Sequence, residues 1–169
     1  MDFLKICIAA FSATNLMTTF SYLLSQHYKK LFKEPVLLNY VFQDTKICPE
    51  GKWAVVCAWV THYFIGLLFV IAYQVVWTYT SVPFGWLSGI AFGIASGIIG
   101  IIGWKGIFRL PNKKPKVHLR EYYIQLFFAH IIFAIAVVVA FKLYDYDPIS
   151  HASEAISHFY SSSSIQTGA

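Results

Sequence analysis

Two histidines stand inside long apolar runs of this 169-residue sequence. His62 lies in VTHYFIGLLF and His130 lies in FFAHIIF. An imidazole can form hydrogen bonds, exchange a proton near neutral pH or bind a metal, and ionisable residues inside apolar spans are usually functional. Both histidines lie about nine residues, or ~13 Å of helix, from the start of their runs, so we expect them at the same depth.

Two more polar residues are expected at this depth, Asn15 in the first apolar run and Ser96 in the third. An unsatisfied polar group in hydrocarbon costs several kcal/mol. We therefore expect the four side chains to point into the protein and to form hydrogen bonds with one another. The sequence predicts a polar layer within the membrane, made of Asn15, His62, Ser96 and His130.

Three interpretations of this layer stay open. In the favoured one, both histidines are neutral and hydrogen-bonded, and they join the helices of a non-enzymatic bundle. In the second, the layer lines a water-filled cavity or path, as in a small permease or channel-like component. In the third, His62 and His130 ligate one b-type haem, because bis-imidazole ligation needs two histidines at equal depth on two helices. The favoured interpretation involves no cofactor.

Other catalytic or metal-binding patterns are missing from the sequence. It contains no G-x-S-x-G, no H-E-x-x-H and no Walker-type glycine loop. Cys7, Cys48 and Cys57 show no paired spacing, so neither a disulfide framework nor a zinc site is indicated. The sequence thus predicts no metal site and identifies no catalytic residue.

The elements that carry these residues are membrane helices. Hydrophobic residues make up 57% of the chain and charged residues 12%, against about 25% charged residues in an ordinary soluble domain. The apolar residues gather into runs close to the ~20 residues that cross a bilayer as a helix. The membrane domain is expected to cover residues 1–145, and a polar, serine-rich tail, expected to be flexible, covers 146–169. We predict an all-α bundle of four transmembrane helices, over about residues 3–24, 53–77, 85–104 and 122–143.

A stripe of six glycines runs along the third helix. The glycines recur at steps of four and then three, so all of them share one face of a helix. Glycine lowers helix propensity, and six on one face make sense where another backbone approaches closely. The stripe predicts tight packing within the bundle, with a homodimer through the same face or a groove for a lipid or apolar ligand as the alternatives. Its members are Gly85, Gly89, Gly93, Gly97, Gly100 and Gly103.

Lysine and arginine are distributed unevenly between the segments that separate the runs. Residues 25–52 contain five and residues 105–121 contain six, whereas the opposite side holds only Lys5 and Lys142. Cytoplasmic segments carry the excess of positive charge, so both termini are expected on the non-cytoplasmic side. The expected location is a bacterial inner membrane, with the basic segments against anionic headgroups. Nothing resembles a nucleic-acid-binding module, so no nucleic acid partner is predicted.

The first basic segment contains one more candidate element. The stretch EPVLLNYVF, residues 34–42, has a glutamate and a proline where a helix would begin and apolar residues on one face. It predicts a short helix that lies in the cytoplasmic interface, with a plain loop as the alternative.

Three stretches give the chain a family resemblance: ATNLMTTFSYLL, GKWAVVCAWVTHYFIG and QLFFAHIIFAI. Together with the glycine-rich third run, they resemble a bacterial family of small four-helix membrane proteins of unknown function. The resemblance covers about residues 9–141. It implies the four-helix architecture and singles out His62, Tyr63, Gly66 and His130, but it implies no activity.

Overall fold

The computed structural model describes residues 3–49, 51–113, 115 and 117–145. The predicted serine-rich tail, 146–169, lies outside the described residues. Within the described ranges the fold is all-α, with five helices and no strand. The helices are α1 (Phe3–Tyr28), α2 (Glu34–Thr45), α3 (Lys52–Tyr79), α4 (Trp86–Ile107) and α5 (Leu119–Tyr144).

Four of these helices, α1, α3, α4 and α5, are long and apolar enough to cross a membrane. This confirms the prediction of an all-α fold with four helices able to span a membrane, as an integral membrane protein requires. The helices continue beyond the predicted runs because polar residues at a helix end lower the local hydropathy without ending the backbone helix. α1, for example, continues to Tyr28.

The short α2 confirms that the segment after Lys33 is a helix rather than a plain loop. Pro35 stands in its first turn, where its missing N–H leaves no helical hydrogen bond unmade. The chain turns before and after α2 at Lys29 and Lys46, which have left-handed φ values of 52° and 54°. These two turns fold α2 back onto the bundle, where it packs against α3. Its position relative to a membrane interface stays a prediction.

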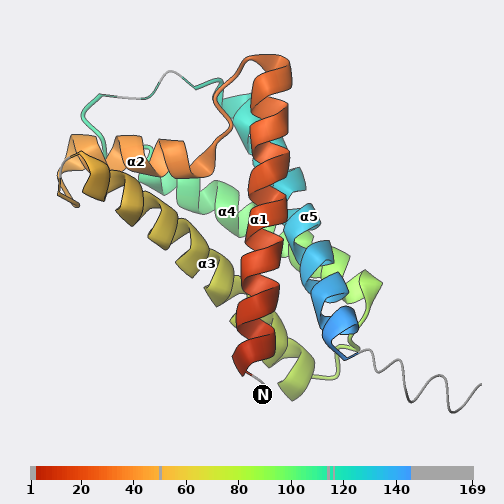
Figure 1. Cartoon of the computed structure of the whole chain (residues 1–169). Helices are drawn as coiled ribbons and strands as arrows, with labels where there is room; N and C mark the ends of the chain where they lie inside the picture. Colours follow the sequence, from red (N-terminus) through yellow and green to blue (C-terminus); the bar gives the residue numbers. More distant parts are fainter. Residues whose placement is uncertain (1–2, 50, 114, 116, 146–169) are drawn as a thin grey trace, which may run out of the picture.

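Among the long helices, α5 lies against both α1 and α4, while α3 packs against α1 and α2 (Figure 1). α3 and α4 are joined by a short turn, and aromatic side chains near it connect the two helices. The ring of Tyr73 stacks on Phe92 at 5.0 Å between centroids, and Trp77 Nε1 donates a hydrogen bond to Ser88 Oγ at 2.9 Å.

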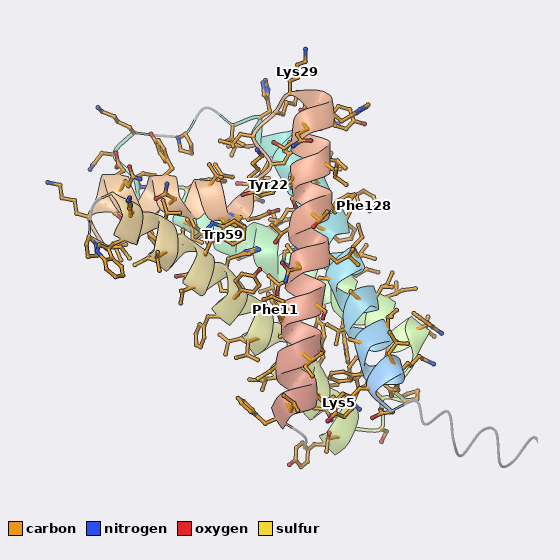
Figure 2. The ribbon with its side chains drawn as sticks, in the orientation of Figure 1. Lys5, Phe11, Tyr22, Lys29, Trp59 and Phe128 are labelled. Carbon is orange, nitrogen blue, oxygen red and sulfur yellow. The ribbon has the colours of Figure 1, made fainter. Side chains whose placement is uncertain are left out.

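Ion pairs join the α1 and α5 segments near both of their ends. Lys5 pairs with Asp145 at one end, and Lys30, just beyond α1, pairs with Glu121 at the other. Between these pairs the outward surface is apolar, and large side chains such as Phe11 and Phe128 are exposed on it (Figure 2). Such a surface is what a lipid-facing helix requires.

The glycine stripe of α4 faces α5 over most of its length. A Cβ added at Gly93 would lie 2.7 Å from the Cα of Ile131, and one added at Gly97 would lie 2.9 Å from Phe127 Cδ2. Gly89 and Gly100 are similarly close to α5, whereas Gly85 and Gly103 have open space around them. The four close glycines therefore pack against α5 of the same chain, and a homodimer through this face stays a prediction.

Candidate functional site

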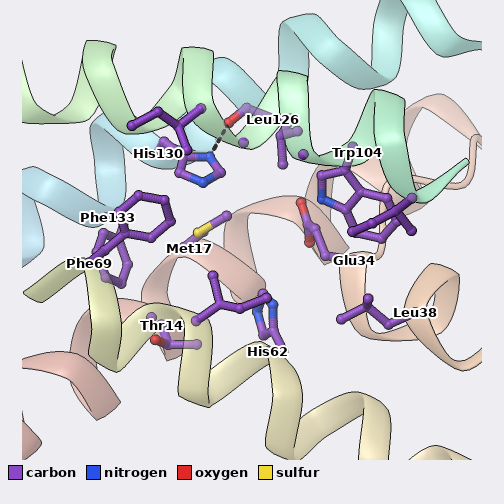
Figure 3. A pocket seen from close by; sticks show the side chains of 16 residues that line it. Thr14, Met17, Glu34, Leu38, His62, Phe69, Trp104, Leu126, His130 and Phe133 are labelled. Atoms are coloured by element: carbon purple, nitrogen blue, oxygen red, sulfur yellow. Dashed lines mark hydrogen bonds between the residues drawn. The ribbon is translucent and has the colours of Figure 1, made fainter. Parts of the chain in front are cut away.

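A cavity of about 180 Å³ lies where all five helices meet (Figure 3). It lies between α3 and α4, away from the turn that joins these two helices and from the aromatic contacts beside that turn. Its walls are mostly apolar and include Met17, Leu38, Phe69, Trp104, Leu126 and Phe133. Four polar side chains also line it: Thr14, Glu34, His62 and His130.

The cavity opens sideways between α3 and α4. The lining residues Ile65 of α3 and Ile99 of α4 are 38% and 56% exposed. Both stand in the apolar middle part of a membrane-spanning helix. With these helices across a membrane, the opening would therefore face the hydrocarbon rather than water.

Glu34, the first residue of α2, is the most unusual group in this cavity wall. Its side chain is only 1% exposed. Oε1 accepts hydrogen bonds from Ser21 Oγ at 2.9 Å and from Gln125 Nε2 at 3.3 Å. Oε2 has no hydrogen-bond partner, and neither ion pair found in the described residues involves Glu34. Burial raises the pKa of this carboxyl from 4.5 to about 7.

His62 is bonded to α1 rather than to the predicted polar layer. Its Nε2 lies 2.9 Å from Thr18 Oγ1. The Thr18 hydroxyl donates its proton to the backbone carbonyl of Thr14 at 2.7 Å. Since that hydroxyl has only one proton, Nε2 of His62 must carry the hydrogen and donate it to Thr18. This bond joins α3 to α1.

His130 is fixed by its own helix. Its Nδ1 lies 2.8 Å from the backbone carbonyl of Leu126, which can only accept, so Nδ1 carries the proton (Figure 3). In the neutral imidazole, Nε2 is then an acceptor, and no hydrogen bond to it is found in the described part of the chain. The ring lies against Gly100, where an added Cβ would be 2.9 Å from Nε2. A glycine of the stripe thus makes room for this imidazole.

Asn15 and Ser96 make hydrogen bonds elsewhere and do not line the cavity. Asn15 Oδ1 accepts from Tyr63 Oη at 2.9 Å, and Ser96 Oγ accepts from Tyr73 Oη at 2.8 Å. Of the four residues of the predicted layer, only His62 and His130 reach the same cavity. Across the described ranges, no hydrogen bond joins any two of the four.

Haem ligation by His62 and His130 would require changes in this arrangement. Nε2 of His62 would have to leave Thr18 to reach an iron. The cavity volume of about 180 Å³ is also below the roughly 300–1,000 Å³ of sites for drug-sized ligands. The side chains as placed do not present a ready haem site, and haem binding stays a prediction.

Sequence reasoning missed Glu34, Ser21 and Gln125 as members of the site. Glu34 looked like an ordinary helix start, and nothing in its local sequence indicates that α2 folds back onto the bundle. A usable signal was present on α1: Thr14, Thr18 and Ser21 recur at steps of four and three, and this places three hydroxyls on one face.

Comparison of this chain with family models, with curated proteins and with solved structures gave no match. The resemblance to a bacterial family of four-helix membrane proteins therefore stays a prediction.

Proposed function

We propose that this chain is a non-enzymatic, multi-pass membrane protein that binds a small molecule in the cavity within its bundle. The observation that carries the proposal is the carboxyl group of Glu34, which lines the cavity, is buried and has an oxygen without a partner. An engineered cavity of 150 Å³ is known to accommodate benzene. The volume of about 180 Å³ is therefore sufficient for a molecule of that size.

A buried carboxyl group is an expensive feature for a bundle that serves only as a scaffold. Leaving a buried acceptor unsatisfied costs about 1–3 kcal/mol, and more for a charged group. Replacing even a buried ion pair by apolar residues of similar volume is often neutral or stabilising, and an unpaired buried carboxylate is more costly than a paired one. A ligand that completes the bonding of Oε2 supplies a reason for Glu34 at this position.

The proposed site can be tested by thiol reactivity. In a background with Cys7, Cys48 and Cys57 replaced by serine, Met17→Cys places a thiol on the cavity wall. Ser96→Cys is the matched control, because Ser96 is also buried, at 1% exposure against 6% for Met17, but does not line the cavity. We expect methyl methanethiosulfonate to modify the Met17→Cys protein much faster, and small aromatic compounds to slow that reaction.

Two results would count against the proposed site. Equal reactivity of the two thiols would mean that small molecules do not enter the cavity. If the thiol of Met17→Cys reacts rapidly and neither benzylamine nor benzyl alcohol slows the reaction, small molecules enter the cavity but these compounds do not bind there.

We also propose that residues 25–52 and 105–121 face the cytoplasm of a bacterium, against anionic headgroups, and that both termini lie on the other side. The uneven distribution of lysine and arginine supports this orientation. Cys48 offers a test when Cys7 and Cys57 are replaced by serine. An impermeant thiol reagent should modify Cys48 in inverted membrane vesicles but not in intact cells, and the reverse pattern would invert the topology.

A further inference from the structure

We infer that the ligand of this cavity is a small organic cation, a protonated amine that carries a compact apolar group. This inference rests on the proposed function, since it names the chemical class that the same cavity would bind. The ammonium group would lie at Glu34 Oε2, and the apolar group would fill the space between α3 and α4.

The charge of the cavity wall selects a cation. Glu34 is the only Asp, Glu, Lys or Arg side chain among the residues that line the cavity in the described part of the chain. An anionic ligand would face a carboxylate with no basic side chain to offset the repulsion. A neutral ligand would leave an ionised carboxylate unpaired in an apolar setting, which is strongly unfavourable. A cation gives Glu34 the counter-ion that the protein does not provide.

The unpaired hydrogen-bonding groups of the cavity wall also favour a cation. An ammonium group has only donors, and it needs acceptors around it. Glu34 Oε2 is an acceptor when the carboxyl is ionised, and His130 Nε2 is an acceptor because Nδ1 is occupied by the Leu126 carbonyl. Both residues line the same cavity (Figure 3). Neither acceptor has a hydrogen-bond partner in the part of the chain described.

The apolar wall of the cavity fits the apolar group of the inferred ligand. Phe69, Trp104 and Phe133 bring three aromatic rings to the cavity (Figure 3). Aromatic faces attract an organic cation within about 6 Å of the ring centroid, and the attraction is largest where water is excluded. The same rings provide an apolar surface for the carbon atoms of the ligand, so one wall serves both parts of an amphipathic amine.

The opening toward the bilayer is compatible with an amine because the occupied site is electrically neutral. A neutral amine that arrives from the hydrocarbon can take the proton of the Glu34 carboxylic acid. The carboxyl O–H bond breaks, an N–H bond forms, and an ammonium–carboxylate pair results. A protonated amine that meets the ionised carboxylate gives the same pair. No net charge has to remain in the bundle in either case.

Protonation of Glu34 competes with the cation, so amine binding should depend on pH. Ser21 and Gln125 form hydrogen bonds with this carboxyl, and Tyr22 and Tyr122 interact with its charge. The side chains of His62, Trp104 and His130 line the same cavity. None of them is a lysine or an arginine. With the pKa of Glu34 at about 7, the affinity for an ammonium ion should fall up to tenfold per pH unit as the pH decreases below 7.

The inference can be tested with three probes of similar shape: benzylamine, benzyl alcohol and benzoate. Binding to the purified full-length protein in lipid nanodiscs would be measured by isothermal titration calorimetry at pH 8 and pH 6. We expect benzylamine to bind at least tenfold more tightly than benzyl alcohol at pH 8, benzoate not to bind, and the preference for the amine to shrink at pH 6.

Glu34→Gln keeps the shape of the side chain and removes its charge. This variant should bind benzylamine at least tenfold more weakly and benzyl alcohol about as well as the unaltered protein. Glu121→Gln is the matched control, because it makes the same change at a carboxylate outside the cavity, and its affinities should be unchanged. Circular dichroism would verify that both variants are folded.

The outcomes separate the two proposals. Equal affinity for benzylamine and benzyl alcohol, or undiminished benzylamine binding to Glu34→Gln, would overturn the cation inference and leave a cavity for neutral molecules. Absence of benzylamine binding together with a reactive, unprotected thiol in Met17→Cys would overturn both. If Glu34→Gln does not fold, the comparison of benzylamine with benzyl alcohol at two pH values decides on the unaltered protein.

Discussion

Replacing Gly93 by alanine tests whether the glycine stripe is a packing surface within the chain. A Cβ at this position would lie 2.7 Å from the Cα of Ile131 and 3.2 Å from both the Ala134 Cβ and the His130 carbonyl oxygen. Two of these three neighbours are backbone atoms, which no side-chain rotation can move. Alanine at residue 93 therefore forces α4 and α5 apart.

The expected size of the effect follows from the matched variant Gly103→Ala. Gly103 lies on the same helix and has no atom within 4 Å of an added Cβ. Both substitutions gain the same helix propensity, up to about 1 kcal/mol in water-soluble helices, so this contribution cancels between them. What remains is the overpacking at residue 93, typically about 1–3 kcal/mol. The folded state should thus be about 5- to 150-fold less favoured in Gly93→Ala than in Gly103→Ala.

Reversible unfolding in mixed micelles, followed by circular dichroism during a titration with sodium dodecyl sulfate, would measure this difference. Equal stability of the two variants would refute the packing argument. Measurement over a range of protein concentrations examines the homodimer alternative as well. If the stripe joined two copies of the chain, the penalty at Gly93 would grow with concentration, whereas packing within one chain makes it constant.

Three further predictions follow from the site. Raising the pH from 4.5 through about 7 should lower the free energy of unfolding by roughly 3 kcal/mol, because a buried acid with a raised pKa favours folding only while it is protonated. In Glu34→Gln, the free energy of unfolding measured in the same assay should no longer depend on pH in this range. Gly66→Ala should destabilise the bundle by about 1–3 kcal/mol because its methyl group overlaps the Thr14 hydroxyl, and Thr14→Ala should restore most of that loss; no recovery in the double variant would disprove the contact. An absorption spectrum of the purified protein should lack a Soret band, and a Soret band lost in both His62→Ala and His130→Ala would establish the haem alternative instead.

The architecture was largely predictable because it depends on quantities that a sequence displays directly. The length and apolar composition of a run decide whether it can span a membrane, and they indicated all four long helices correctly. The order of residues along a helix decides which side chains share a face, so the spacing of the glycines alone was enough to predict the stripe. The proline after Glu34 marked the beginning of α2.

The partners of the polar residues were not predictable, because depth along a helix does not determine its rotation. Thr14 and Asn15 are adjacent in depth, but their side chains project about 100° apart around α1. In the structure the face of Thr14, Thr18 and Ser21 turns toward the bundle, and Thr18 receives the hydrogen bond of His62. Asn15 turns partly outward and contacts Tyr63. Only the packing of all helices together sets this rotation.

Glu34 shows a second reason why the site was hidden from sequence reasoning. A glutamate before a proline is a favourable way to begin a helix at a surface, where the carboxylate interacts with the helix dipole and with water. The left-handed turn at Lys29 instead places the same residue inside the protein, beside Ser21 and Gln125. Non-glycine residues rarely adopt a left-handed conformation, so the lysine at this position does not predict the turn.

The hydrogen bonds of the described polar residues separate structural roles from functional ones. His62 with Thr18, Ser96 with Tyr73 and Asn15 with Tyr63 each join two helices, so these hydrogen bonds have a structural role. The predicted role of His62 as a hydrogen-bonding residue therefore needs no ligand. Glu34 and His130 differ, because Glu34 Oε2 and His130 Nε2 line the cavity and have no hydrogen-bond partner in the described part of the chain, as is also true of Thr14 Oγ1. If stability alone had selected these two side chains, apolar residues would serve better, and this contrast is the physical reason to look for a ligand at the cavity.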